Sequence, residues 1–150
     1  MDFEIIDKKI AGFMLRTGTI ALRVSLGIIF IWFGLLKTAG LSPAEPLVVA
    51  TVGWMPFFGA ITWVIIIGWW EVIIGVFFLF RATIRIAIPL LAMQMVGTFL
   101  PLIILTAVTF QPGLFPYAPT MEGQYIIKNL LIISAALVVG GTVRGDLPDK

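Results

Sequence analysis

The chain has 150 residues, of which 60% are apolar and 12% are charged, and its net charge is +2. A soluble domain is roughly one quarter charged, and a core of this size cannot bury so much apolar surface, so the composition excludes an ordinary soluble protein and predicts one domain solvated by lipid. The sequence has no Cys and no His, which excludes dithiol chemistry, thiolate iron–sulfur sites and His-ligated haem or metal, and the small charge gives no support to nucleic-acid binding.

The N-terminal segment has apolar residues at helical spacing. They are Phe3, Ile6, Ile10 and Phe13, with Glu4, Asp7 and Lys8 on the other side. This pattern predicts a short amphipathic N-terminal helix that lies on the cytoplasmic interface of the membrane. A frayed polar tail is an equally weighted alternative.

Four segments are long and apolar enough, or nearly so, to cross a bilayer, which takes about 20 residues of helix. They are 19–36, 57–80, 86–110 and 125–143. Pro89 and Pro101 predict kinks in the third. The predicted fold is therefore all-α, an integral membrane four-helix bundle in a single transmembrane domain.

The basic residues are confined to one side of these spans. They are Lys8, Lys9 and Arg16 before the first span, Arg81 and Arg85 between the second and third, and Arg144 and Lys150 after the fourth. The opposite loops, 39–56 and 111–124, contain no Lys or Arg. The positive-inside rule then predicts that both termini are cytoplasmic, in a multi-pass protein of a bacterial-type inner membrane.

The two opposite loops are rich in proline and apolar residues. We expect them to form a compact cap against the outer end of the bundle. The alternative is a surface covered by a partner subunit.

Glu71 lies near the middle of the second span, where an ionisable group is costly and needs a reason. Gly68 and Gly75 share its helical face, and such small residues allow another helix to approach closely. Glu71 is therefore predicted to point into the bundle.

The other spans each offer a face of small and polar residues. These faces are Arg23, Gly27, Phe30, Gly34 and Lys37; Gln94, Gly97 and Pro101; and Asn129, Ala136 and Gly140, with Lys128 beside them. Together with Glu71, they predict a polar intramembrane network of Arg23, Lys37, Glu71, Gln94, Lys128 and Asn129.

The sequence leaves two interpretations of Glu71 open. In the structural one it pairs with Arg23 and sets the helix register, because buried charges usually pair. In the functional one it is a protonatable group that serves a ligand or a proton. Lys37 and Lys128, near the outer surface, either extend to the headgroups or form a basic site at the outer mouth.

Several tryptophans also lie within the spans, although tryptophan prefers the membrane interface. Trp32, Trp69 and Trp70, with Glu71, are candidates to line a pocket for a quinone or a lipid headgroup, because flat apolar walls and one hydrogen-bonding group suit such a ligand. Ordinary aromatic packing is the alternative for each indole. No catalytic residue, covalent cofactor or metal site is predicted.

Three segments resemble the DoxX-like family of small membrane proteins. They are 23–37, Glu71 with Gly75, and 125–130, which resemble parts of that family's first, second and fourth helices. The resemblance covers about 21–141, and the related YkgB-like group has a similar first helix. Arg23, Lys37, Glu71, Lys128 and Asn129 match the family's polar positions.

The resemblance implies an accessory subunit of a larger membrane oxidoreductase or respiratory complex, which is not catalytic alone and contributes to a quinone pocket. Its expected partners are membrane lipid and other membrane subunits. Two alternatives stay open. One is a purely structural or assembly subunit, and the other is a small proton-coupled transporter, because a buried Glu flanked by Trp resembles the small multidrug exporters.

Overall fold

The computed structural model describes residues 2–143, and these residues are almost entirely helical. The helices are α1 (Asp2–Thr38), α2 (Glu45–Val52), α3 (Ala60–Leu79), the 3₁₀ helix η1 (Arg81–Thr83), α4 (Ile84–Phe99), α5 (Pro101–Ile104), α6 (Thr106–Thr109), α7 (Met121–Ile127) and α8 (Asn129–Gly141). Within the described range, β structure is limited to an isolated bridge between Phe110 and Pro119. Arg144 and Lys150, which the topology prediction uses, lie outside the described residues.

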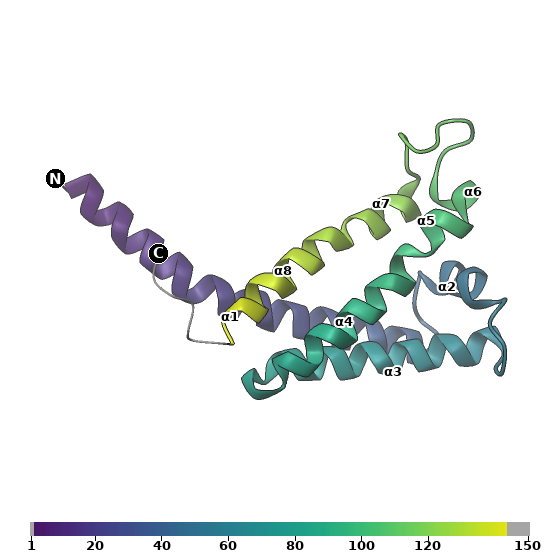
Figure 1. The fold of residues 1–150 in the computed structure, drawn as a ribbon, viewed down its shortest axis with the longest axis horizontal. Helices are drawn as coiled ribbons and strands as arrows, with labels where there is room; N and C mark the ends of the chain where they lie inside the picture. Colours follow the sequence, from purple (N-terminus) through teal and green to yellow (C-terminus); the bar gives the residue numbers. More distant parts are fainter. Residues whose placement is uncertain (1, 144–150) are drawn as a thin grey trace.

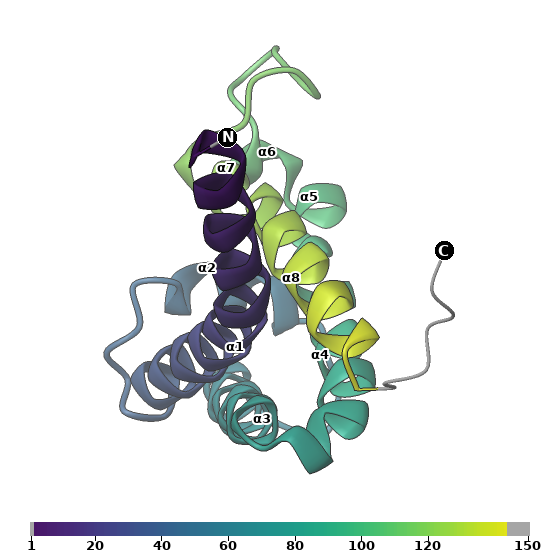
Figure 2. The ribbon, with the colours of Figure 1, turned by 90° about the vertical axis from the view of Figure 1, so that its left-hand side faces the viewer.

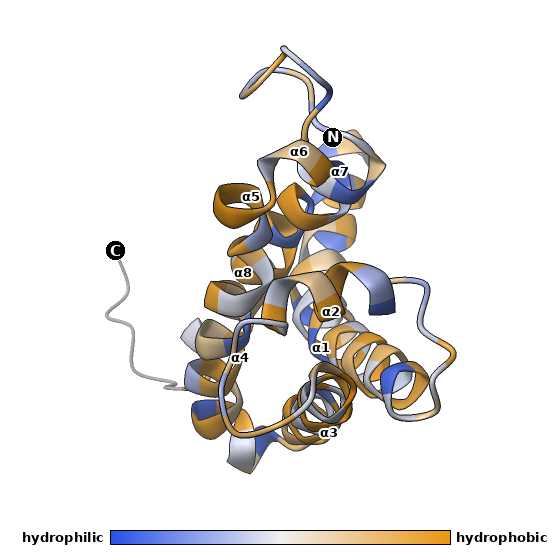
Figure 3. Cartoon of the chain, turned by 90° about the vertical axis from the view of Figure 1, so that its right-hand side faces the viewer, coloured by the Kyte–Doolittle hydropathy of each residue, from blue (hydrophilic) through white to orange (hydrophobic). Residues whose placement is uncertain are grey.

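Four of the helical segments are long and apolar enough to cross a membrane. They are Phe3–Thr38, Ala60–Leu79, Arg81–Ile104 and Met121–Gly141. Most of their residues are hydrophobic, with polar residues at isolated positions (Figure 3). The predicted all-α fold, with four helices long and apolar enough to span a membrane, is therefore confirmed.

The first helix differs from the prediction. The amphipathic N-terminal segment is not a separate short helix but continues into the first span as a single helix of 37 residues, about 55 Å long at 1.5 Å per residue. No proline interrupts it, and Gly12 and Gly18 are accommodated without a break. The N-terminal half of α1 extends past the other helices (Figure 1), and Phe3, Phe13 and their neighbours there are exposed.

The third span, Arg81–Ile104, begins and ends earlier than predicted and is broken near its end. Pro89 lies inside α4 without ending it, whereas Pro101 begins a new helix, α5. At Leu105 the backbone leaves the helical region (φ −123°, ψ 45°), so the continuous span ends at Ile104 and not at Phe110. The fourth span begins earlier than predicted, at Met121, where the Thr120 hydroxyl accepts a hydrogen bond of 3.3 Å from the Gly123 amide.

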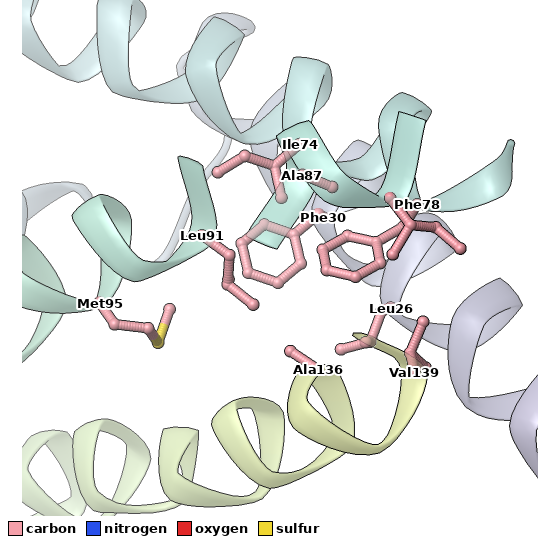
Figure 4. Packing of buried hydrophobic residues seen from close by; sticks show 10 residues of the cluster. Leu26, Phe30, Ile74, Phe78, Ala87, Leu91, Met95, Ala136 and Val139 are labelled. Carbon is pink, nitrogen blue, oxygen red and sulfur yellow. The ribbon is translucent and has the colours of Figure 1, made fainter. Parts of the chain in front are cut away.

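The spans pack as a four-membered ring. α1 and α3 form the most extensive contact, α4 packs against α3 and α8, and α8 returns to α1. Figures 1 and 2 show this arrangement from two sides. All four helices contribute to one apolar core, shown in Figure 4: Leu26, Phe30, Ile74, Phe78, Ile84, Ala87, Leu91, Met95, Ala136 and Val139.

Different elements lie at the two ends of the bundle. The start of α1, the η1 turn and the end of α8 lie toward one end, and α2, α5 and α6 lie at the other (Figure 1). The cap predicted there is formed in part, because α2 packs against α3 and α5 and buries Thr51 and Val52. The loop between α6 and α7 projects away from the helices instead (Figure 2).

Candidate functional site

A buried polar cluster joins three helices in the interior of the bundle. Lys37 Nζ on α1 donates a hydrogen bond of 2.6 Å to Glu71 Oε2 on α3. Gln94 Nε2 on α4 donates one of 2.8 Å to the other carboxylate oxygen, Oε1. The Lys37 and Glu71 side chains are 11% and 10% exposed, so this ion pair is shielded from the surroundings. Glu71 therefore points into the bundle, as predicted, and contacts a base on another helix.

The glycines on the same faces bring α1 and α3 together around this cluster. A Cβ atom on Gly34 would lie 2.5 Å from the Gly68 carbonyl oxygen, and one on Gly75 would lie 2.6 Å from that of Gly27. No side chain fits at such distances, so the backbones are in direct contact. The sequence-based expectation of close helix packing at Gly68 and Gly75 is confirmed, and the space beside Glu71 is occupied by α1.

The partner predicted for Glu71 was wrong, because Arg23 does not reach it. In a helix the Cα–Cβ bonds tilt toward the N-terminus, so in the antiparallel pair Lys37 and Glu71 lean toward each other. Arg23 lies about 21 Å before Lys37 along α1, and its side chain leans further away. This directional rule favours Lys37 over Arg23 only when the register of the two antiparallel helices is known.

Lys37 therefore does not extend to the headgroups, as was expected of a lysine near the outer surface. Instead it turns inward to the carboxylate. Gln94 joins the cluster from α4, in agreement with the predicted polar network.

Lys128 and Asn129 do not join this cluster. The Lys128 ammonium lies 5.2 Å from the centre of the Tyr125 ring, a cation–π contact within the same segment. The Asn129 amide donates to the carbonyls of Tyr125 and Ile126, one turn earlier in the chain. Both residues thus have local roles at the start of α8, and the predicted six-residue network reduces to three members.

The three tryptophans proposed for a quinone or headgroup pocket have different environments. Trp32 and Trp69 are 63% and 53% exposed, so their indoles lie on the outer surface of the bundle. Trp70 packs against the core, and its Nε1 donates a hydrogen bond of 3.3 Å to the Leu90 carbonyl oxygen. Glu71 is only 7% exposed. The quinone site stays a prediction, with the two exposed indoles at the lipid-facing surface and the carboxylate enclosed.

The cluster has the chemistry of a neutral, satisfied ion pair. Each carboxylate oxygen accepts a hydrogen bond from a different helix, and the ammonium charge balances the carboxylate charge. Within residues 2–143, no group of three or more acidic side chains is placed to hold a metal ion. The arrangement is suited to fixing three helices relative to one another.

Arg23 belongs to a different part of the molecule. It lines a pocket with Thr19, Ile20, Arg81, Ile84 and Thr142, where α1, η1 and the end of α8 meet. Sequence reasoning missed this grouping, because it joins residues from both ends of the chain with the turn between α3 and α4.

Comparisons of the chain with protein families, with curated proteins and with solved structures found no match.

Proposed function

We propose that the protein is a non-catalytic accessory subunit of a larger membrane oxidoreductase or respiratory complex, of the kind that the DoxX-like resemblance implies. The observation that carries the proposal is the exposure of aromatic residues on two loops at the end of the bundle opposite the N-terminus. The Lys37–Glu71–Gln94 cluster and the close packing of α1 on α3 agree with a structural, non-catalytic role.

These residues, which we call the loop-end aromatic surface, lie on the loop between α2 and α3 and on the loop between α6 and α7, which stand apart from each other (Figure 3). They are Trp54, Phe57, Phe58, Leu114, Phe115 and Tyr117, each at least 49% exposed. Phe57 and Tyr117 are the extremes, at 90% and 89% exposed. Exposed apolar patches of this kind are typical of surfaces that contact another protein or the membrane interface.

Phe57 is also held in an unfavourable backbone conformation. Its φ of 77° lies in the left-handed region, which is a true outlier for a bulky residue. Such strain persists where the surrounding structure imposes it, and it concentrates at sites of binding. Contact of a partner subunit with Phe57 would account for this strained conformation.

The ion pair inside the bundle supports the accessory role. Glu71 is already bound by Lys37 and Gln94, and α1 occupies the space beside it. A redox reaction would then depend on groups held by the partner. Any quinone contact of this chain is proposed at the outer surface, where Trp32 and Trp69 are exposed.

The distribution of basic residues supports a cytoplasmic location for both ends of the chain, in a bacterial-type inner membrane. The aromatic surface then faces the outer side. The partner subunit is expected to have matching apolar surface on that side.

The test is gentle purification from the native membrane, followed by identification of the co-purifying proteins and of haem, flavin and quinone in the preparation. We expect redox subunits and their cofactors with the unaltered chain. Phe57→Ser and Tyr117→Ser should lose them while the helical content is unchanged. Phe3→Ser, which alters an 84% exposed residue at the opposite end, is the matched control.

Other outcomes would replace the proposal. Co-purification with a large assembly that has no redox cofactor would favour the structural or assembly role. A chain that purifies alone and exchanges protons for a substrate in vesicles would favour the transporter.

A further inference from the structure

The pocket lined by Arg23 and Arg81 lies apart from both the Glu71 cluster and the loop-end aromatic surface. Its volume is about 180 Å³. Its walls come from α1 (Thr19, Ile20 and Arg23), from η1 and the start of α4 (Arg81 and Ile84), and from the residue after α8 (Thr142). Three elements that are distant in sequence thus converge on a site with two guanidinium groups.

Arg23 carries a buried polar atom with no partner among the described residues. Its Nε is shielded from solvent and makes no hydrogen bond. A buried N–H without a partner costs free energy, so nearly all such groups in proteins bind something. The described residues thus leave a hydrogen-bond donor in the pocket that an acceptor bound there would satisfy.

The pocket has an excess of positive charge. Arg81 makes one long contact, 3.4 Å from a terminal nitrogen to the Thr142 carbonyl. Among the described side chains of residues 3–143 the sole ion pair is Lys37–Glu71, so neither arginine pairs with a carboxylate of that range. A second hollow beside the first is lined by Arg81, Ala82, Arg85 and Val143, which adds a third guanidinium.

The walls also have an apolar component open to the bilayer. Ile20 lines the pocket and is 57% exposed on the outer face of α1. Val24, one helical turn further on the same face, is exposed as well. A molecule in this pocket thus meets guanidinium groups at one point and lipid-facing apolar surface next to it.

We propose that this pocket binds the phosphate of an anionic phospholipid, in the leaflet on the side where η1 and the end of α8 lie. Arginine is the residue suited to a phosphate, because its planar fork donates two parallel hydrogen bonds to two oxygens. Basic pockets between membrane helices recognise anionic headgroups in this way. The acyl chains run along the exposed apolar face of α1.

The proposal is tested by native mass spectrometry of the full chain in neutral detergent, titrated with phosphatidylglycerol or with phosphatidylcholine. We expect phosphatidylglycerol to bind more tightly. Loss of one charge-assisted contact, in Arg23→Gln or Arg81→Gln, should weaken its binding about tenfold. Since Arg81 is exposed, its variant keeps the test valid if the Arg23 variant fails to fold.

The matched control is Arg16→Gln, which removes the same charge from an exposed position of α1 outside the pocket. This variant should bind the lipid as tightly as the unaltered chain. Equal weakening by Arg16→Gln would show diffuse attraction to a basic surface and would overturn the site.

Competition with inorganic phosphate distinguishes a lipid headgroup from a soluble phosphate compound as the bound anion. If phosphate at millimolar concentration displaces phosphatidylglycerol and raises Tm alone, the pocket takes a soluble phosphate compound and the lipid proposal is wrong. If the two lipids bind equally, the pocket does not select a lipid of net negative charge, and the proposal of an anionic phospholipid is wrong.

Discussion

At the scale of single residues, the interior of the bundle depends on how Glu71 is satisfied. An ionised group near mid-membrane costs about 2.5–3.5 kcal/mol on insertion scales if nothing compensates it. Here the Lys37 ammonium balances the charge at 2.6 Å and the Gln94 amide occupies the second oxygen at 2.8 Å. Because the two charges are desolvated together, each depends on the other, and the removal of one leaves an uncompensated charge.

We therefore predict that Glu71→Gln destabilises the protein by about 3–5 kcal/mol, because Lys37 is left buried without a countercharge. Adding Lys37→Met to this variant should restore part of the loss, since both charges are then gone. The measurement is the free energy of unfolding in a mild denaturant, for each single variant and the double variant.

The control for this cycle is Lys128→Met, which removes an exposed lysine whose contact is with Tyr125. It should leave stability almost unchanged and show no coupling to Glu71→Gln. Additive losses from Glu71→Gln and Lys37→Met would contradict the pairing, because contacting residues couple by about 0.5–3 kcal/mol.

The second prediction concerns the contribution of the Gln94 amide to the free energy of unfolding. Gln94→Met keeps the length of the side chain but removes the donor to Glu71 Oε1, and hydrogen bonds to charged groups contribute about 1.5–3 kcal/mol. We expect a loss in that range. Gln124→Met, the same change at an exposed position, is the control. Equal effects of the two would show that Gln94 contributes nothing specific.

At the scale of elements, the α1–α3 pair is set by two glycine contacts seven residues apart on each helix. Gly34 lies against Gly68, and Gly27 against Gly75, with Glu71 between the two contacts along α3. This spacing leaves no Cβ atom at the two points where the backbones of α1 and α3 meet. The close approach then places the Lys37 ammonium within reach of the carboxylate.

Gly68→Ala should force these helices apart, since the new Cβ would lie 2.8 Å from the Gly34 carbonyl oxygen. Overpacking of this kind costs about 1–3 kcal/mol. Gly97→Ala is the matched control, because a Cβ there meets nothing within 4 Å and alanine favours helix more than glycine does. Thermal unfolding of both variants measures the difference. A Gly68→Ala protein as stable as Gly97→Ala would show that the helices are not in contact there.

At the scale of the whole molecule, the four spans place the start of α1 and the end of α8 toward the same end of the bundle (Figure 1). The basic residues gather at that end, in Arg16, Arg23, Arg81 and Arg85. The aromatic loops gather at the other. This asymmetry in charge is the physical basis for a single orientation in the membrane.

We predict that a reporter fused after Lys150 is active only in a cytoplasmic form, and that one inserted in the loop between α6 and α7 is active only in a periplasmic form. The positive charges beside η1 resist translocation, whereas the opposite loops have none. Activity measured for both fusions with both types of reporter tests this. Periplasmic activity after Lys150 would reverse the orientation.

The sequence by itself determined the fold class, the four spans and the inward direction of Glu71. These depend on hydropathy, helix length and side-chain periodicity, which are local properties of the chain. The sequence also identified the glycine faces, because small residues at helical spacing indicate close packing whatever their partner is. It did not determine where the helices begin, since Gly12 and Gly18 were compatible with either a break or a continuous helix.

The tertiary structure decided which polar groups meet. Lys37 and Arg23 share one face of α1, and periodicity treats them alike. The antiparallel register of α1 on α3, with the tilt of side chains toward each helix N-terminus, selects Lys37 for Glu71. The same register leaves Arg23 beside Arg81 at the opposite end. Such pairings depend on the relative height of two helices, and no property of one helix alone contains that information.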